Sequence, residues 1–497
     1  MTEQVVKRVV IAGGGTAGWV AAAALVKQLG PLLDITLVES DEIGTVGVGE
    51  STIPTSRSFH DLLGISEPAF MRATQATFKL GIAFENWGRI GDRFIHSFGE
   101  IGRRSTWMAD FHHFWMAARE QGFGGSLADY CFELRASEAG KFGKVEGVNI
   151  NYAYHLDATL YARFLRGLAE PAGVRRVEGK IARVEQHPET GFIAGLVLES
   201  GTRIEGDLFI DCTGFRALLI EQTLHTGFED WARWISTDSA FAVQTRSTGP
   251  AIPLTRAIAH EAGWRWRIPL QHRVGNGLVY CSEFMTDEDA RAKLLNDIEG
   301  EPLIEPRLIR YRTGCRRQVW NKNCVALGLA SGFIEPLEST SIHLVKVAVT
   351  RLIQEFPFGG CDAALAERFN AQSRYELEGI RDFIILHYHL TEREDSPFWR
   401  RCRTMEIPAS LAQRMAVFRA HAHAWQDGGD LFRVDSWVQV LLGQRLAPRS
   451  YHRLARMMGA AELRDALQGL KTNIDAAVAR LPSQQEFLAS YCAAGES

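Results

Sequence analysis

The sequence has little that would mark a secreted, nucleic-acid-binding or metal-binding protein. Its 497 residues include eight cysteines with no CxxC pair and no dense spacing, which favours reduced thiols in a cytoplasm over a disulfide framework. The formal net charge is -4 and no block of like charges occurs, so we expect no nucleic-acid surface and no charged tail. We also expect no metal site. Internal repeats and low-complexity segments are lacking too.

Only one apolar run is long enough to suggest a membrane span or a signal peptide. It covers residues 9–26 and reads VVIAGGGTAGWVAAAALV. Three consecutive glycines at its centre weaken a continuous helix and argue against both. The apolar content of 46% and charged content of 23% fit a soluble globular protein. We therefore expect a cytoplasmic protein without membrane contact, of roughly two to four structural units given its length.

The same run contains a dinucleotide-binding motif. Residues 9–19 predict a strand, a tight turn and a helix, and Gly13, Gly15 and Gly18 match GxGxxG. The first glycine makes the turn, the second lets the backbone approach a pyrophosphate, and the third packs the helix on the strand. A second strand ends at Glu39, where an acid would bind ribose hydroxyls. The predicted cofactor-binding residues of this motif are Gly13, Gly15, Thr16, Ala17, Gly18 and Glu39.

Later glycine-containing segments favour FAD over NAD as the cofactor. The loop at residues 44–52, GTVGVGEST, follows the second strand directly and supplies Val46, Gly47 and Glu50. Buried strands at 206–215 and from 324 return to glycine turns, the second adding Leu329 and Ile342. This arrangement resembles FAD enzymes of the aromatic-hydroxylase type.

The predicted fold class is therefore α/β, with a discontinuous FAD-binding Rossmann-like domain and a mostly α-helical C-terminal part on the substrate side. The FAD-binding ranges are 1–95, 150–225 and 300–355, and the substrate-side ranges are 96–149, 226–299 and 356–497. Within the first set, residues 155–170 predict a helix capped by Asp157, with Leu160, Phe164, Leu165 and Leu168 on its buried stripe.

Two stretches alternate with the period of a strand. In GWRWRIPL, residues 263–270, Trp264 and Trp266 share one face, as either an aromatic core wall or a partition between two compartments. In FKLGIAFENW, residues 78–87, Lys79 lies beside small neighbours, with room for a small reactant. On spacing alone, a surface lysine on a half-exposed strand is the favoured interpretation of Lys79.

The motifs occur in one order along the chain: the glycine turn, GVGE at 47–50, KxGIxFxNW from Lys79, WxWxIP from Trp264 and EPLEST at 335–340. Together they resemble the flavin-dependent halogenases related to tryptophan halogenases. The resemblance is close from residue 1 to about 355 and looser to the C-terminus.

This resemblance implies an activity. A separate flavin reductase supplies FADH2, O2 reacts with it, and a halide ion, chloride or bromide, is oxidised to hypohalous acid. Lys79 matches the family's lysine, which either binds hypohalous acid by hydrogen bonding or carries the halogen as a haloamine. Glu338 matches the glutamate that stabilises the cationic intermediate of the aromatic ring and accepts its proton. The alternative for Glu338 is an acid capping the helix that starts near Ser341.

The resemblance also assigns the surroundings of the reaction. The backbone N–H groups of Thr340 and Ser341 would bind the halide at a helix N-terminus, although relatives have glycine in place of Ser341. The tryptophans Trp264 and Trp266, with Pro269, match the family's wall between flavin and substrate. His96 and Phe98 match one side of an indole-stacking site, and a core histidine is the alternative for His96. These five substrate-side residues are His96, Phe98, Trp264, Trp266 and Pro269.

Other activities are open at this stage. A flavin-dependent aromatic monooxygenase is the runner-up, followed by a reductase or saturase and by a flavin-holding sensor. Between Ser436 and Ala461 the chain has no Asp or Glu to pair with a substrate ammonium. We therefore expect indole or another small, neutral aromatic substrate rather than free tryptophan, or else a larger substrate in an open chamber. We also expect a monomer or homodimer.

Overall fold

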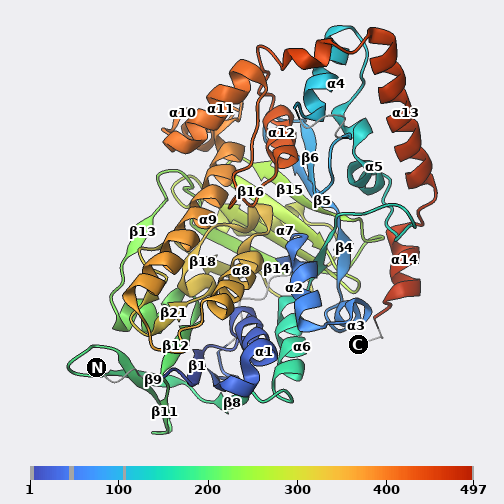
Figure 1. The fold of residues 1–497 in the computed structure, drawn as a ribbon. Coiled ribbons are helices and arrows are strands. Elements are labelled where there is room, and N and C mark those ends of the chain that lie inside the picture. Colours follow the sequence, from blue (N-terminus) through green and yellow to red (C-terminus); the bar gives the residue numbers. More distant parts are fainter. Residues whose placement is uncertain (1–4, 44–49, 104–107, 495–497) are drawn as a thin grey trace. The chain divides into compact units, whose positions relative to one another are not determined.

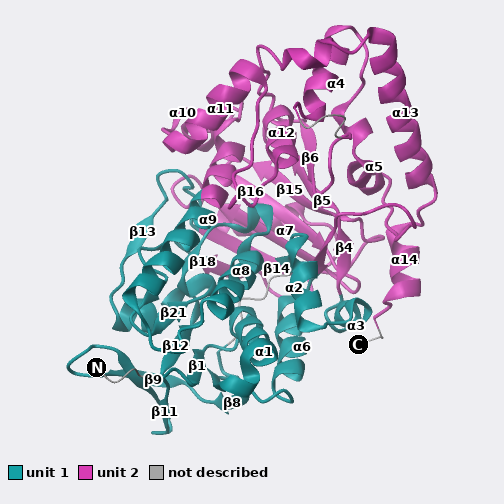
Figure 2. Cartoon of the chain, viewed as in Figure 1, with its two compact units in different colours: residues 1–75, 156–238, 310–378 teal, residues 76–155, 239–309, 379–497 magenta. Residues whose placement is uncertain are grey.

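The computed structural model describes residues 5–43, 50–103 and 108–494. The chain divides into two compact units (Figure 2). Unit 1 comprises residues 1–75, 156–238 and 310–378, and unit 2 comprises residues 76–155, 239–309 and 379–497. The two units follow from how the chain packs, whereas the ranges predicted from the sequence group residues by function. Their boundaries therefore do not have to coincide.

Unit 1 is built on a six-stranded sheet in the order β20-β21-β12-β1-β2-β8. The central strand β1, Arg8–Ala12, pairs in parallel with β2, Asp34–Glu39, and with β12, Leu208–Asp211. Residues 9–12 are buried on both faces, as is usual for a central strand of a parallel sheet. The remaining strands are β8 Arg175–Glu178, β21 Cys324–Ala326 and the antiparallel β20 Trp320–Asn321.

Helices α1 Thr16–Leu29, α6 Ala158–Ala169 and α8 Ser341–Gln354 pack together in unit 1 (Figure 1). The Asp157 cap of α6 is confirmed, because its carboxylate accepts from the N–H groups of residues 159 and 160. Of the predicted buried stripe, Leu165 is buried and Leu160 and Phe164 are half-buried. The prediction is wrong for Leu168, which is 43% exposed. The buried side chains of α6 are Ala158, Tyr161, Ala162, Leu165 and Ala169.

Smaller elements complete unit 1. The helices are η1 Gly30–Leu32, α2 Thr55–Leu63, α3 Glu67–Ala73, η3 Gly214–Arg216, η4 Leu218–Thr223, η5 Gly328–Ala330 and η6 Pro336–Glu338. The strands are β3 Glu50–Ser51, β9 Ile181–Gln186, β10 Ile193–Leu198, β11 Arg203–Glu205, β13 Phe228–Asp230, β19 Gly314–Arg316 and β22 Gly332–Phe333.

Unit 2 is built on a seven-stranded sheet in the order β18-β14-β17-β16-β15-β5-β6. The strands are β5 Gly81–Glu85, β6 Arg93–Ser97, β14 Ser239–Thr245, β15 Leu254–His260, β16 Gly263–Pro269, β17 Val274–Tyr280 and β18 Arg307–Arg310. The single strand predicted over residues 78–87 is wrong. The chain instead forms β4, Thr77–Lys79, which pairs with β7, Ala153–Leu156, and then enters β5 after Leu80.

The C-terminal part is helical, and the predicted α/β fold class is confirmed. Helix α9, Ala363–His389, is followed by α10 Pro397–Thr404, α11 Ala409–His421, α12 Val434–Gly443, η7 Arg453–Arg456, α13 Ala460–Ala479 and α14 Gln484–Tyr491. Further helices of unit 2 are α4 Phe111–Glu120, η2 Leu127–Tyr130, α5 Phe132–Glu138 and α7 Asp287–Asp297. Of the helices in the described ranges, none combines the length and the hydropathy needed to cross a bilayer.

The core of unit 1 holds a charged residue that no motif predicts. Lys346 on α8 is 3% exposed, and its Nζ lies 5.2 Å from the ring centroid of Phe59 and 5.4 Å from that of Tyr161. Among the residues that the structure describes, this ammonium has no hydrogen-bond partner. Burial lowers the pKa of Lys346 from 10.5 to about 7, because a low-dielectric environment disfavours the charged form.

Replacing this lysine should stabilise the protein in a pH-dependent way. Between pH 7 and 10.5 the unfolded chain binds a proton at residue 346 that the folded chain lacks, so the free energy of unfolding should rise with pH there. Below about pH 7 the full penalty applies, at most roughly 5 kcal/mol. Lys346→Met should therefore raise the free energy of unfolding by a few kcal/mol at pH 6.5 and by little at pH 10, as measured by urea denaturation.

The matched control is Lys27→Met, which removes an exposed lysine from α1 of the same unit. It should change the free energy of unfolding by no more than about 0.5 kcal/mol at either pH. Equal stability of Lys346→Met and the original protein at pH 6.5 would contradict the burial argument.

Candidate active site

The glycine turn between β1 and α1 has the geometry that a pyrophosphate site needs. Gly13 adopts a φ of +107°, and a Cβ there would lie 2.3 Å from the carbonyl oxygen of Cys212. A Cβ on Gly18 would lie 1.9 Å from the carbonyl oxygen of Gly13, so only glycine permits this contact between helix and turn. At Gly15 nothing lies within 4 Å of the corresponding position. The turn is therefore closely packed on its protein side and open at the N-terminus of α1.

Glu39 lies at the end of β2 and points back to this turn. A Cβ on Gly14 would come within 1.5 Å of its Oε2 atom, which places the carboxylate directly against the glycine turn. Its Oε1 atom accepts a hydrogen bond of 2.6 Å from Arg176 Nε on β8. The sequence predicted the acid at this place but gave no sign of the arginine that holds it.

Only part of the second predicted cofactor loop, residues 44–52, lies within the described residues. Val46 and Gly47 lie outside the described residues. Glu50 belongs to the short strand β3, and burial, followed by the negative charge of Asp157, raises its pKa to about 7. Next to it, the hydroxyl groups of Ser51 and Ser339 are 2.6 Å apart. Within unit 1, β3 therefore contacts the segment that precedes α8.

The third predicted cofactor segment lies against the first. A Cβ on Gly328 would come within 2.8 Å of the Cβ of Ala17, so η5, which contains Leu329, packs closely on the start of α1. Ile342 is buried in the first turn of α8. Unit 1 thus brings the predicted Thr16–Ala17 and Leu329 segments together from positions more than 300 residues apart.

The predicted halide-binding residues lie at the N-terminus of α8. Thr340 is its N-cap and Ser341 its first residue, and no side chain caps the helix at Thr340. The Thr340 hydroxyl is buried without a hydrogen-bond partner among the described residues. Ser339 turns the chain with a φ of +59°, and Glu338 before it is 1% exposed. An uncapped helix N-terminus beside a buried hydroxyl is a site where an anion is favoured.

Lys79 is fully buried in unit 2, so the interpretation of it as a surface lysine is wrong. It is 0% exposed, and its Nζ lies 5.2 Å from the ring centroid of Phe98. The following strand starts at Gly81, where a Cβ would lie 2.5 Å from the carbonyl oxygen of His96. The small neighbour predicted from the sequence is therefore required by the close approach of β5 and β6.

The tryptophan pair, Trp264 and Trp266, lies on one buried face of β16 as predicted. Their ring centroids are 6.0 Å apart, and Trp87 extends the group at 6.5 Å from Trp264. The Trp266 ring lies over Gly277 of β17, where a Cβ would come within 2.0 Å of it. The tryptophan rings thus form one aromatic layer, and the contact of Trp266 with β17 requires the glycine at position 277.

His96 is 2% exposed and lies among aromatic rings in unit 2. The ring centroids of Phe383 and Phe432 are 5.5 Å and 6.2 Å from its own. Next to it, Gln439 of α12 accepts hydrogen bonds of 2.9 Å from the N–H and 3.0 Å from the hydroxyl of Ser97. The C-terminal helix α12 is therefore fixed on the strand that carries His96.

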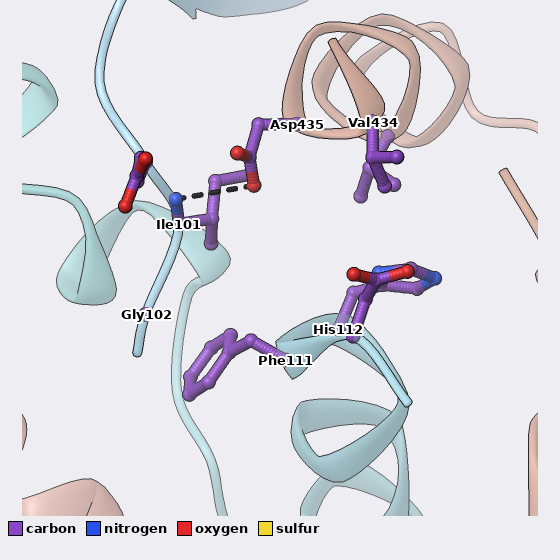
Figure 3. Close-up of a pocket in the computed structure, with 9 residues that line it drawn as sticks. Ile101, Gly102, Phe111, His112, Val434 and Asp435 are labelled. Carbon is purple, nitrogen blue, oxygen red and sulfur yellow. Dashed lines mark hydrogen bonds between the residues drawn. The ribbon is translucent and has the colours of Figure 1, made fainter. Parts of the chain in front are cut away.

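A pocket opens in unit 2 three residues after Phe98 (Figure 3). Asp435, from the first turn of α12, accepts a hydrogen bond of 3.2 Å from the N–H of Ile101, and Phe111 and His112 face it from the start of α4. Burial raises the pKa of Asp435 above its usual value. The remaining lining residues are Glu100, Gly102, Asp110, Val434 and Val438. No motif in the sequence predicted this pocket.

The predicted site residues thus fall into two groups. Unit 1 contains the described cofactor residues together with Glu338, Thr340 and Ser341, and unit 2 contains Lys79, the tryptophan pair, Pro269, His96 and Phe98. Sequence reasoning missed Lys346, Arg176 and Asp435, because their significance comes from long-range packing rather than from local spacing.

Comparison with known proteins gives a consistent result. A family model described as Tryptophan halogenase matches residues 8–460. Tryptophan 6-halogenase SttH of Streptomyces toxytricini is 35% identical, and the match covers 97% of this chain and 98% of that protein.

Solved structures agree with the sequence matches. A flavin-dependent halogenase from Xanthomonas campestris matches with a TM-score of 0.98 and 55% identity, covering 99% of this chain and 100% of the other. BrvH, a flavin-dependent halogenase from Brevundimonas sp. BAL3, matches with a TM-score of 0.94 and 44% identity over 98% and 99% of the two chains.

The dependence of Trp266 on Gly277 can be measured. Gly277→Ala should displace the indole ring and lower the free energy of unfolding by about 1–3 kcal/mol, because the Trp266 ring fills the space that the new methyl group needs. Gly249→Ala is the control, since nothing lies within 4 Å of that position. Chemical denaturation followed by tryptophan fluorescence measures both variants, and equal stability would refute the close contact.

Proposed function

The chain belongs to the tryptophan halogenase family and is a flavin-dependent halogenase, and from this premise we propose that Lys79 and Glu338 are its catalytic residues. The observation that carries the proposal is the complete burial of the Lys79 ammonium beside the Phe98 ring. Lysine side chains are rarely buried this completely, and strongly perturbed environments of titratable groups cluster at functional sites. The hydroxylase alternative is not favoured, because the relatives are halogenases.

We propose that unit 1 holds FAD and unit 2 the aromatic substrate. The open position at Gly15 and the uncapped N-terminus of α1 fit a pyrophosphate, and Glu39 lies where a ribose would follow. Bound as FADH2 from a separate reductase, the cofactor supplies with O2 the oxidising equivalents that turn halide into hypohalous acid. The chain's own residues then have to hold the halide, guide the oxidant and remove a proton.

Thr340 and Ser341 are proposed to bind the halide through their backbone N–H groups. The support for this is the uncapped start of α8 and the buried Thr340 hydroxyl, which can donate to an anion. The Ser341 side chain is only half-buried, so it borders this site without filling it.

Lys79 is proposed to receive hypohalous acid and present its halogen to the ring. An ammonium can donate a hydrogen bond to the oxygen of hypohalous acid, which makes the halogen more electrophilic. A new carbon–halogen bond then forms as the oxygen–halogen bond breaks, the hydroxide takes a proton from the Lys79 ammonium and leaves as water, and the ring carbon loses its proton. Lys79 regains a proton when the proton of the ring carbon is released to solvent. The buried Glu338 carboxylate is the proposed acceptor of that proton, and its charge stabilises the ring cation.

The substrate is proposed to be indole or another neutral aromatic compound. The Tyr451 hydroxyl donates a hydrogen bond to Glu120 and accepts one of 3.0 Å from Nε of Arg456. Tyr451 and Arg456 are therefore not free to bind the amino acid group of a substrate. Trp437 packs beneath the Arg414 guanidinium at 4.6 Å. We also propose bromide, the more easily oxidised halide, as the better co-substrate, because a less closed substrate chamber favours it.

Variants of Lys79 and Glu338 test the catalytic assignment. With FAD, NADH, a flavin reductase and bromide, Lys79→Ala and Lys79→Met should each lower halogenation by about 100-fold or more, because both remove the ammonium. Lys79→Met keeps the volume of the side chain, so it separates loss of charge from loss of packing. Hypohalous acid caught by a β-diketone trap should persist in both variants. Glu338→Gln should lower the rate by about 100-fold. Normal halogenation by Lys79→Met would overturn the assignment.

Competition between substrates tests the second proposal. Given equal concentrations of indole and L-tryptophan, the enzyme should halogenate indole in about tenfold excess or more, because an unpaired buried ammonium is costly. Product masses under bromide and under chloride measure the ratio. A preference for tryptophan that Asp435→Asn abolishes would show that the ammonium is bound in the Asp435 pocket, and the substrate proposal would be wrong.

A further inference from the structure

A chain of three hydrogen bonds crosses the core of unit 2 beside Lys79. The Nε2 atom of His155 lies 2.9 Å from Thr255 Oγ1, its Nδ1 atom lies 3.0 Å from Thr77 Oγ1, and Thr77 Oγ1 lies 2.7 Å from the carbonyl oxygen of Pro269. Thr77 and His155 are 0% exposed and Thr255 is 5% exposed. These four residues, which we name the Thr–His relay, form a polar path through the core of unit 2.

The chemistry of the partners fixes the direction of every proton in the relay. The Pro269 carbonyl can only accept, so the single hydroxyl proton of Thr77 is donated to it. Thr77 must then accept from His155, which places the imidazole proton on Nδ1. In a neutral ring Nε2 is an acceptor, and the Thr255 hydroxyl donates to it. Each polar atom of this path has a partner when the imidazole is neutral.

The electrostatic surroundings keep the imidazole neutral. Burial, and after it the positive charge of Lys79, lowers the pKa of His155 well below its usual value. A protonated ring there would repel the Lys79 ammonium at low dielectric. The relay therefore supplies polar anchoring next to Lys79 without adding a second cation.

The relay also joins the strands on which the proposed chemistry depends. Thr77 and Lys79 are two residues apart on β4, so their side chains leave the same face of the strand. Thr77 pairs with His155 in the register of β4 and β7, and Thr255 belongs to β15. Pro269 is the last residue of β16, the strand that carries the tryptophan pair.

We propose that the Thr–His relay positions the Lys79 ammonium relative to the strand of the tryptophan pair, with His155 and Thr77 as positioning residues. This inference rests on the proposed function, because it concerns the same lysine. Without the relay, β4 is no longer tied to the end of β16, and hypohalous acid escapes before Lys79 can present it. A displacement of about 1 Å at a reacting group can cost about 100-fold in rate.

Two substitutions of Thr77 separate positioning from simple stability. Thr77→Val keeps the shape of the side chain and removes the hydroxyl, whereas Thr77→Ser keeps the hydroxyl and removes a methyl group. In the complete assay with FAD, reductase, bromide and indole, the measured quantity is the ratio of bromoindole to trapped hypohalous acid. Thr77→Val should lower this ratio about tenfold or more, and Thr77→Ser should restore most of it.

A matched control removes an equivalent hydrogen bond elsewhere in unit 2. Thr245 is 0% exposed, and its hydroxyl accepts a hydrogen bond of 2.9 Å from Asn276 Nδ2. Thr245→Val should lower the free energy of unfolding as Thr77→Val does, by about 1–3 kcal/mol, and leave the product ratio unchanged. His155→Phe should reproduce the effect of Thr77→Val, since it removes both bonds of the imidazole.

The outcomes distinguish this inference from the proposed function. If the unaltered enzyme makes no bromoindole, or if Lys79→Met still makes it, the assignment of Lys79 is at fault. If both behave as proposed and Thr77→Val keeps the original product ratio, the relay has no positioning role and the inference is overturned. An equal fall of the ratio in Thr245→Val would also overturn it, because the effect would then follow stability alone.

Discussion

The complete burial of the Lys79 side chain is the constraint around which its neighbours in unit 2 are arranged. A fully buried lysine has to be surrounded by groups that tolerate it, and the structure provides the face of Phe98 and a neutral, hydrogen-bonded imidazole. Two residues further along the chain, the pairing of β5 with β6 brings Gly81 against the carbonyl oxygen of His96. Sheet geometry, aromatic packing and the polar path of His155 all accommodate that single charge.

Each of the two units contains glycines that allow the backbone to come very close to another group. In unit 1, glycines let the turn after β1 contact both α1 and the chain beyond β12, leaving an open surface at Gly15. In unit 2, Gly277 lets an indole ring lie directly on a neighbouring strand. In each case a side chain at the glycine would collide with the group that lies against it, a backbone carbonyl at Gly13 and Gly18 and an indole ring at Gly277.

Local spacing predicted much of this structure and long-range packing determined the rest. GxGxxG, the cap at Asp157 and the alternation around Trp264 depend on residues close in sequence, and the structure has all three. The buried face of α6 was predicted only in part, because the elements that pack on the helix decide its burial: Tyr161 and Leu165 are buried and Leu168 is exposed. Lys79 was ambiguous for the same reason: alternation predicts two faces of a strand, but only tertiary packing decides whether both are buried.

The two lysines that are buried among the described residues, Lys79 and Lys346, lie in different surroundings. Lys346 lies between the rings of Phe59 and Tyr161, and its pKa falls to about 7, so its folded environment favours the neutral amine. Lys79 lies beside an imidazole that is held neutral and tied by hydrogen bonds to two threonines. A neighbouring imidazole that stays neutral does not repel an ammonium, so the surroundings of Lys79 suit a lysine that donates a hydrogen bond. The aromatic rings around Lys346 suit a neutral amine that donates none. The polar groups that surround each side chain, and not the depth of burial alone, therefore distinguish Lys79, the proposed catalytic residue, from Lys346.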